Sequence, residues 1–147
     1  LLSVEEAVGK EEEKERKERP EHMLSWKARL EWAAPEAREL VDKLIKKVES
    51  ELSGISGVSR YRWYYLYRGA GRGLESLFAV LMIKKKKVSI RIKADPAKFR
   101  DKLKWTKKYK GWFFARKYEE REFSISSPEQ FDDAIELIKQ SYDISQG

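Results

Sequence analysis

The chain has 147 residues, of which 39% are charged and 41% hydrophobic, and its formal net charge is +7 at pH 7. This length is enough for one domain with a substantial core, while the longest apolar run, residues 77–83, is far shorter than the roughly 20 residues that span a bilayer. The absence of cysteine excludes disulfides, thiolate chemistry and cysteine-based zinc sites. Since no signal sequence is recognisable, we expect a cytoplasmic protein without a membrane partner. The abundance of Lys, Glu and Arg is typical of thermophiles.

Residues 1–22 predict a charged arm in front of a single domain of residues 23–147. The stretch from Glu11 to Arg19 is almost entirely Glu, Lys and Arg, with i,i+4 pairs of opposite charge that support an exposed helix. No apolar stripe follows Val8, so this arm has no face to bury. We expect a solvated arm, helical or disordered, that ends at Pro20.

Two helices are predicted next. Residues 23–34 contain apolar residues that favour a short helix packed on the core. Pro35 then suits the first position of a helix, where its missing N–H costs nothing. From Ala37 to Leu52 apolar residues recur at helical spacing, which predicts a helix to about Ser53 with a purely structural apolar face.

The middle of the chain predicts strands. Residues 53–57 favour a turn, and residues 60–68 a strand rich in aromatic side chains. The apolar run 77–83 predicts a buried central strand, and the lysines at 84–87 a hairpin to a second strand at 88–93 with one dry and one basic face. With a period of two, four aromatic residues of the first strand share one face: Tyr61, Trp63, Tyr65 and Tyr67.

The last third predicts a return to the sheet and a closing helix. We expect a short helix at 96–103, a strand at 112–118 and a further extended segment at 119–126. Ser127 and Gln130 are spaced for a capping box, which predicts the start of a helix that ends near Tyr142. The fold class that follows is α+β, a two-layer domain in which an antiparallel sheet of about four strands packs against helices.

Positive charge and aromatic rings coincide in one part of the chain. Residues 84–118 carry 15 basic and 2 acidic side chains, whereas residues 119–147 carry 2 and 8. Thirteen of the 18 aromatic residues lie between positions 60 and 118. Clustered cations attract a polyanion through counterion release, and flat rings stack on bases that are not paired. The combination predicts a site for single-stranded nucleic acid.

The candidate site residues fall into two groups. The phosphate-binding group comprises Arg60, Arg62, Arg68, Lys84, Lys85, Lys86, Lys87, Arg91, Lys93, Lys104, Lys107, Lys108, Lys110, Arg116 and Lys117. The stacking group comprises five aromatic residues of the basic part of the chain: Trp63, Tyr65, Trp105, Tyr109 and Trp112. Three other rings, those of Phe78, Phe99 and Phe123, are expected in the core.

Catalytic chemistry has little support in the sequence. The only histidine is His22, so a histidine-based triad and a zinc site are not expected. A carboxylate-metal nuclease stays an alternative, because acidic residues such as Asp95, Asp101 and Glu119 lie near the basic region. The same residues are explained more simply as solvent-exposed polar positions. We expect no enzyme, no cofactor and no metal.

The order of these segments resembles the ThermoDBP family of single-stranded DNA-binding proteins from hyperthermophilic archaea. The resemblance rests on a Glu/Lys-rich arm, a capped helix, the run Arg60-Tyr-Arg-Trp-Tyr-Tyr-Leu-Tyr-Arg68, a Lys-rich hairpin, the run Lys104-Trp-Thr-Lys-Lys-Tyr-Lys-Gly-Trp-Phe-Phe114 and a closing helix. It implies a cleft with an apolar floor and basic flanks, little sequence preference and a nucleoid-associated role in genome maintenance. It also implies a dimer through a C-terminal zipper-like segment, which is absent from these 147 residues.

Two other functions stay open at this point. Single-stranded RNA is one, because stacking and phosphate contacts serve both polymers and only contacts to the 2′-hydroxyl separate them. The other is a protein-interaction module whose basic face binds an acidic partner.

Overall fold

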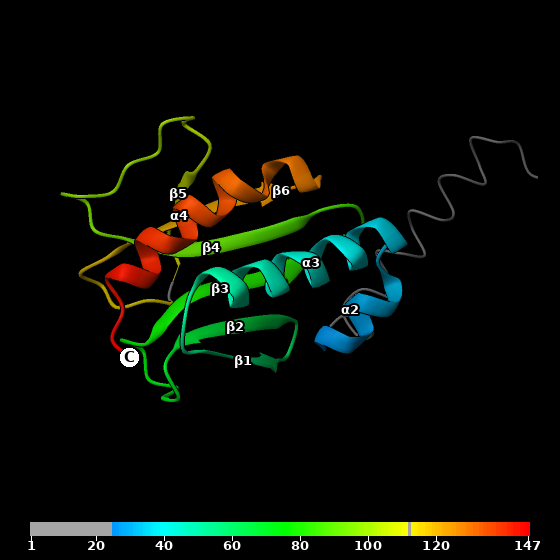
Figure 1. Ribbon diagram of the computed structural model, residues 1–147, viewed down its shortest axis with the longest axis horizontal. Helices are drawn as coiled ribbons and strands as arrows, with labels where there is room; N and C mark the ends of the chain where they lie inside the picture. The colour runs from blue at the N-terminus through cyan, green and yellow to red at the C-terminus, as the bar shows by residue number, and fades with distance from the viewer. Residues whose placement is uncertain (1–24, 112) are drawn as a thin grey trace, which may run out of the picture.

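The computed structural model describes residues 25–111 and 113–147, so the predicted arm at 1–22 lies outside the described residues. Six strands form one antiparallel sheet in the order β1-β2-β3-β4-β6-β5 (Figure 1). Their bounds are β1 Ile55–Arg60, β2 Trp63–Arg68, β3 Leu77–Ile83, β4 Val88–Ala94, β5 Lys107–Tyr109 and β6 Glu119–Ile125. The α+β class is confirmed, and the expected count of about four strands is wrong.

Three helices lie on the same side of this sheet (Figure 1). They are α2 Trp26–Trp32, α3 Pro35–Glu51 and α4 Phe131–Asp143, the last preceded by a 3-10 turn, η1 Pro128–Gln130. The predicted start of the closing helix is confirmed, because Ser127 and Gln130 form a reciprocal capping box. None of the helices within the described ranges has the length and apolarity needed to cross a bilayer.

One main core fills the space between helices and sheet. The predicted apolar stripe of α3 is buried, and so is that of α4. Opposite them the sheet contributes Phe78, Leu81, Ile90 and Phe123, all at most 3% exposed. Ser141 of α4 is fully buried as well, with its hydroxyl bonded to the backbone of β3 and β4. Apolar burial and one satisfied polar anchor therefore fix this helix on the sheet.

The first hairpin corrects the prediction for residues 53–68. The chain bends at residues 52–54, which overlap the predicted turn, but β1 already begins at Ile55. A second reversal that the sequence did not predict lies at Tyr61 and Arg62, because Arg60 pairs directly with Trp63. Alternating aromatics hid this reversal, since the turn contains neither Gly nor Asn. Gly57 has no room for a side chain, because the ring of Tyr64 packs where a Cβ would lie. Strand β1 is thus recruited by pairing with β2 rather than by its own β propensity.

The segment between β4 and β6 also differs from expectation. The helix predicted at 96–103 is absent from the described structure, and hydrogen-bonded turns at Asp95 and Asp101 take its place. The strand expected at 112–118 is wrong for its described part, residues 113–118, and residues 107–109 pair with β6 instead. Phe114 packs on the sheet at 7% exposure, so packing rather than strand pairing decides the path of this segment.

Candidate nucleic-acid interface

The two faces of the sheet carry different side chains. The covered face points toward the helices and belongs to the main core. The other side, which we call the open face, carries Trp63, Tyr65 and Tyr67 from β2 and Arg91 from β4. The predicted shared face of the β2 aromatics is therefore confirmed for these three residues, while Tyr61 lies in the turn.

A small aromatic cluster occupies the open face. Trp63 and Phe113 meet edge to face with ring centroids 4.9 Å apart, and Tyr65 lies 6.0 Å from the same Phe113 ring. Trp63, Tyr65 and Phe113 are each half-buried, above a smaller buried layer formed by Tyr67, Leu77, Val80 and Phe114. The three rings therefore pack on a buried layer and still expose part of their surface to solvent.

Arg91 lies at the centre of this cluster. Its guanidinium is 3.9 Å from the ring centroid of Tyr109, 5.2 Å from that of Trp63 and 5.3 Å from that of Phe113. Such distances are typical of cation–π contacts. Tyr109 comes from the edge strand β5, so Arg91 connects rings from three separate segments of the chain.

Two carboxylates of β6 lie beside Arg91. Its side chain is 3.6 Å from Glu120 and 3.4 Å from Glu122. Burial raises the pKa of Glu120, and the attraction of Arg91 opposes that shift. A Cβ at Gly111 would overlap the Glu120 carboxylate, so the β5–β6 connection passes directly over this group. The two carboxylates therefore compensate the charge of Arg91, which holds rings in place more than it adds net positive charge.

The first hairpin adds two exposed arginines to the open face. The guanidinium of Arg60 lies 5.5 Å from the Tyr65 ring centroid, and that of Arg62 lies 5.3 Å from the Trp63 ring centroid. Neither arginine forms an ion pair within the described part of the chain. Each stacking candidate on β2 therefore has an uncompensated cation beside it.

Further cations border the open face at its edge and its end. Lys107 is exposed and pairs in register with Glu122, which places it on this face, and Lys110 is exposed just beyond β5. Strand register places the hairpin of residues 84–87 at the same end of the sheet as the Tyr61 turn. Lys86 and Lys87 are exposed there, whereas Lys85 also donates to the Trp32 carbonyl at 2.8 Å.

Other predicted phosphate ligands have structural partners. Arg68 donates to the carbonyls of Tyr142 and Ser145 at the end of α4. Lys93 is 1% exposed and donates to the Glu75 carbonyl, and burial lowers its pKa to about 8. Two exposed lysines form ion pairs: Lys108 with Glu119 at 3.3 Å, and Lys117 with Glu75 at 3.4 Å. The exposed residues Lys104 and Arg116 lie outside the aromatic cluster.

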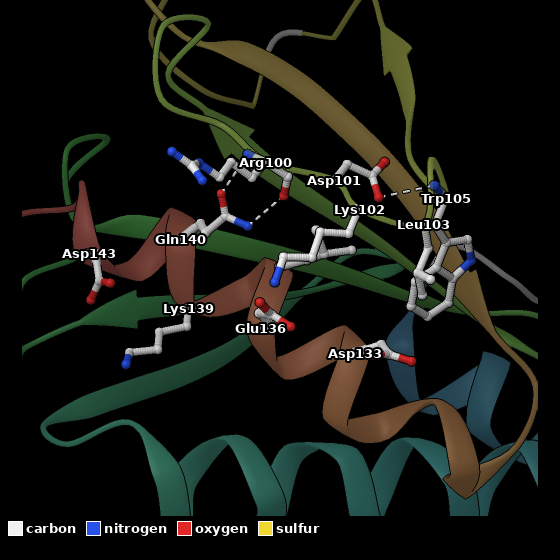
Figure 2. Close-up of a pocket in the computed structure, with 11 residues that line it drawn as sticks. Arg100, Asp101, Lys102, Leu103, Trp105, Asp133, Glu136, Lys139, Gln140 and Asp143 are labelled. Carbon is white, nitrogen blue, oxygen red and sulfur yellow. Dashed lines mark hydrogen bonds between the residues drawn. The ribbon is translucent and has the colours of Figure 1, made fainter.

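Trp105 lies apart from the other stacking candidates. Its ring centroid is 4.8 Å from that of Phe123, and it packs against the main core. It lines a groove of about 420 Å³ between α4 and the 100–105 loop (Figure 2). The walls of this groove mix both signs, because Arg100 and Lys102 come from the loop and Asp133 and Glu136 from α4, with the Lys102 side chain extending toward Glu136. Trp112, another predicted stacking residue, lies outside the described residues.

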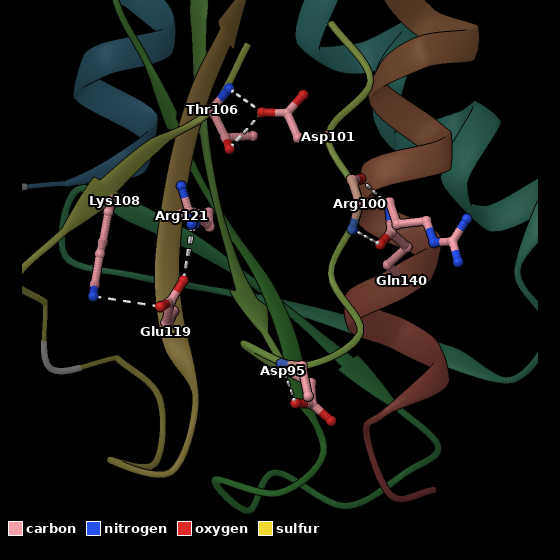
Figure 3. A network of polar contacts seen from close by, with 9 residues as sticks. Asp95, Arg100, Asp101, Thr106, Lys108, Glu119, Arg121 and Gln140 are labelled. Atoms are coloured by element: carbon pink, nitrogen blue, oxygen red, sulfur yellow. Dashed lines mark hydrogen bonds and ion pairs between the residues drawn. The ribbon is translucent and has the colours of Figure 1, made fainter. Parts of the chain in front are cut away.

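The loop beside this groove is held by polar contacts (Figure 3). Gln140 accepts from the Arg100 amide and donates to its carbonyl, at 2.9 and 2.8 Å. The Asp101 carboxylate accepts from the Trp105 amide and from both N–H and hydroxyl of Thr106. These contacts fix the direction of the chain into β5, and so the position of Tyr109 on the open face.

Two residues of this region were not among the sequence candidates. Phe113 was passed over because its neighbours in sequence are aromatic rather than basic, although Arg91 approaches it in space. Tyr61 was grouped with a strand face, but it stands at the hairpin tip with 77% of its surface exposed. The register of β1 and β2 shows the position of Tyr61, and the contact with Arg91 across the open face shows that of Phe113.

No group of acidic or histidine side chains in the described ranges is arranged to hold a metal ion. The expected core positions of Phe78 and Phe123 are confirmed, and Phe99 is partly buried against the same core. The chain matches no family model, no curated protein and no solved structure.

Proposed function

We propose that this protein binds single-stranded DNA with little sequence preference through the open face of its sheet, without catalysing a reaction. One observation carries the proposal: the half-buried rings of Trp63 and Tyr65 each lie beside an exposed arginine, on the sheet face that no described helix covers. A ring that only fills a core needs no such cation.

The two halves of the interface have separate roles. Bases stack on Trp63, Tyr65 and Tyr109, while Phe113 and Arg91 hold these rings in position. Phosphates contact the exposed cations along the rim of the face: Arg60, Arg62, Lys86, Lys87, Lys107 and Lys110. Stacking tolerates any base because every base has a π-face, which accounts for the low sequence preference.

Stacking also accounts for the choice of a single strand over a duplex. The bases of a duplex are already stacked on each other and cannot reach the rings without unpairing. The rim cations alone would attract both forms, so the preference measures the contribution of the rings. RNA is the nearest alternative ligand, and the described residues of this face carry no feature that favours a 2′-hydroxyl over its absence.

The experiment is a competition series at fixed salt. A fluorescent oligothymidylate bound to the protein is displaced by unlabelled single-stranded DNA, duplex DNA of the same sequence, and single-stranded RNA. We expect single-stranded DNA to compete at least tenfold better than duplex. Equal competition by duplex would overturn the stacking interface, and stronger competition by RNA would reassign the ligand.

The matched variants are Trp63→Ala and Trp105→Ala, which remove the same ring from opposite sides of the sheet. We expect the first to weaken binding and the second to leave it unchanged at a temperature where both are folded. Weakened binding by Trp105→Ala alone would move the interface to the groove beside α4.

A further inference from the structure

The tip of the first hairpin has an unusual backbone. Tyr61 and Arg62 form a two-residue turn between β1 and β2, and Tyr61 has a φ of 54°. Two-residue hairpins favour Gly, Asn or Asp where φ is positive, because a side chain crowds the backbone in that conformation. A bulky aromatic residue is an outlier at such a position and places strain in the turn.

Packing does not explain the choice of tyrosine. The residue is 77% exposed, which makes it the most exposed of the large hydrophobic residues in the described structure. Burial of the Tyr61 ring therefore offsets little of the free-energy cost of its backbone conformation. A strained residue that contributes so little to the core points to a role at the surface.

The surroundings of Tyr61 indicate what that role is. Arg60 and Arg62 flank it, and the segment 53–74 contains no acidic residue. The neighbouring hairpin tip at the same end of the sheet adds the exposed lysines Lys86 and Lys87. On the other side, Tyr61 is two residues from Trp63, the first aromatic residue of β2 on the open face. The turn therefore carries an exposed ring between the aromatic side chains of β2 and the cations at this end of the sheet.

We propose that Tyr61 is a further stacking residue, which receives a base of the strand where it leaves the open face between the two hairpin tips. This inference rests on the proposed function, because it extends the same interface by one contact. The Tyr61 ring is exposed at the tip of the turn, and we expect the flanking arginines to contact the phosphates on either side of the stacked base. We expect Tyr61 to lower the stability of the fold and to raise the affinity for the strand.

The test uses the expected opposite effects of Tyr61 on stability and on binding. Tyr61→Gly removes the ring and supplies the residue that the backbone conformation prefers. We expect a melting temperature equal to or above that of the wild type, together with about tenfold weaker binding of an oligothymidylate. The dependence of affinity on salt should stay the same, because no cation is lost. Tyr61→Phe keeps the ring and should bind like the wild type.

Tyr61→Asn provides a second variant that tolerates positive φ and lacks a ring, and it should match Tyr61→Gly. If the wild type binds and both variants bind equally well, Tyr61 is not a stacking residue while the proposed function stands. If both lose melting temperature as well as affinity, the tyrosine is structural and the inference is overturned. If the wild type itself binds no single strand, the proposed function fails and this inference fails with it.

Discussion

The two faces of one sheet follow different rules in this protein. Strand β4 shows the contrast directly, because Ile90 and Ile92 are fully buried under the helices while Arg91 faces the other way among aromatic rings. The covered face is closed by apolar packing of aliphatic and aromatic side chains. The open face is filled by rings and guanidinium groups, with a small buried layer beneath them. Under the proposed function, fold stability and ligand contact depend on opposite sides of the same strands.

This contrast also explains why large aromatic residues can serve either purpose. Trp105 and Trp63 each follow a basic residue in sequence, yet one packs against the main core while the other lies on the open face. The side of the sheet decides the role. This division is tested by variants that should lower stability without lowering affinity, and by variants that should lower affinity without lowering stability.

The largest expected effect is on the covered face. Phe78→Ala removes a fully buried ring between β3 and α4 and should lower the free energy of unfolding by about 3–5 kcal/mol. Chemical denaturation measures this loss. Affinity for single-stranded DNA, measured well below the new melting temperature, should stay within twofold of the wild type. A parallel loss of affinity in the folded variant would contradict the separation of the two faces.

The next effect concerns Lys93, which is buried although it belongs to the strand that carries Arg91. Its folded pKa of about 8 lies below the ordinary 10.5. Below pH 8 the amine is protonated in both states, and its burial opposes folding. Between about pH 8 and 10.5 the unfolded chain binds the additional proton, so this residue makes stability rise with pH.

Lys93→Met should remove that rise. The measurement is the difference in melting temperature between variant and wild type at pH 7 and at pH 10, so that tyrosine titration cancels. We expect the variant's advantage over the wild type to be larger at pH 7 than at pH 10. A constant difference would show that the lysine is not held in the environment described here.

A smaller effect is expected from the rings of the open face. Trp63→Ala should cost about 1–3 kcal/mol of binding free energy, because one base loses its stacking partner. The slope of log affinity against log salt should not change, since no phosphate contact is removed. Trp105→Ala serves as the matched control and should lose stability while keeping affinity. The division of roles would be refuted by the opposite pattern in these two variants.

The smallest effect is that of a single rim cation. Lys107→Ala should reduce the magnitude of the salt slope by about 0.7, the value for one phosphate contact on a single strand. Lys46→Ala is the matched control, because Lys46 is exposed on α3 and paired with Asp42 at 2.9 Å. Binding titrations at four salt concentrations give both slopes. Equal slopes in wild type and both variants would remove Lys107 from the interface.

Local patterns were sufficient for much of this fold. The apolar stripe after Pro35, the continuous run at 77–83 and the capping box at Ser127 each predicted an element that the structure contains. These signals depend on neighbours within one or two turns of the chain, so a sequence carries them in full. The strand register of the aromatic residues on β2 was readable for the same reason.

Only the tertiary structure decided which charges and rings meet. By sequence, residues 84–118 form a strongly positive block, yet the strand order places β6 between β4 and β5 and brings Glu120 and Glu122 beside Arg91. The same pairing commits Arg68 and Lys93 to structural contacts and places Trp105 on the covered side. Charge and stacking act through space, and strands that are neighbours in a sheet can be distant in sequence. The composition therefore predicts the kind of ligand, while the pairing of the strands decides which residues would contact it under the proposed function.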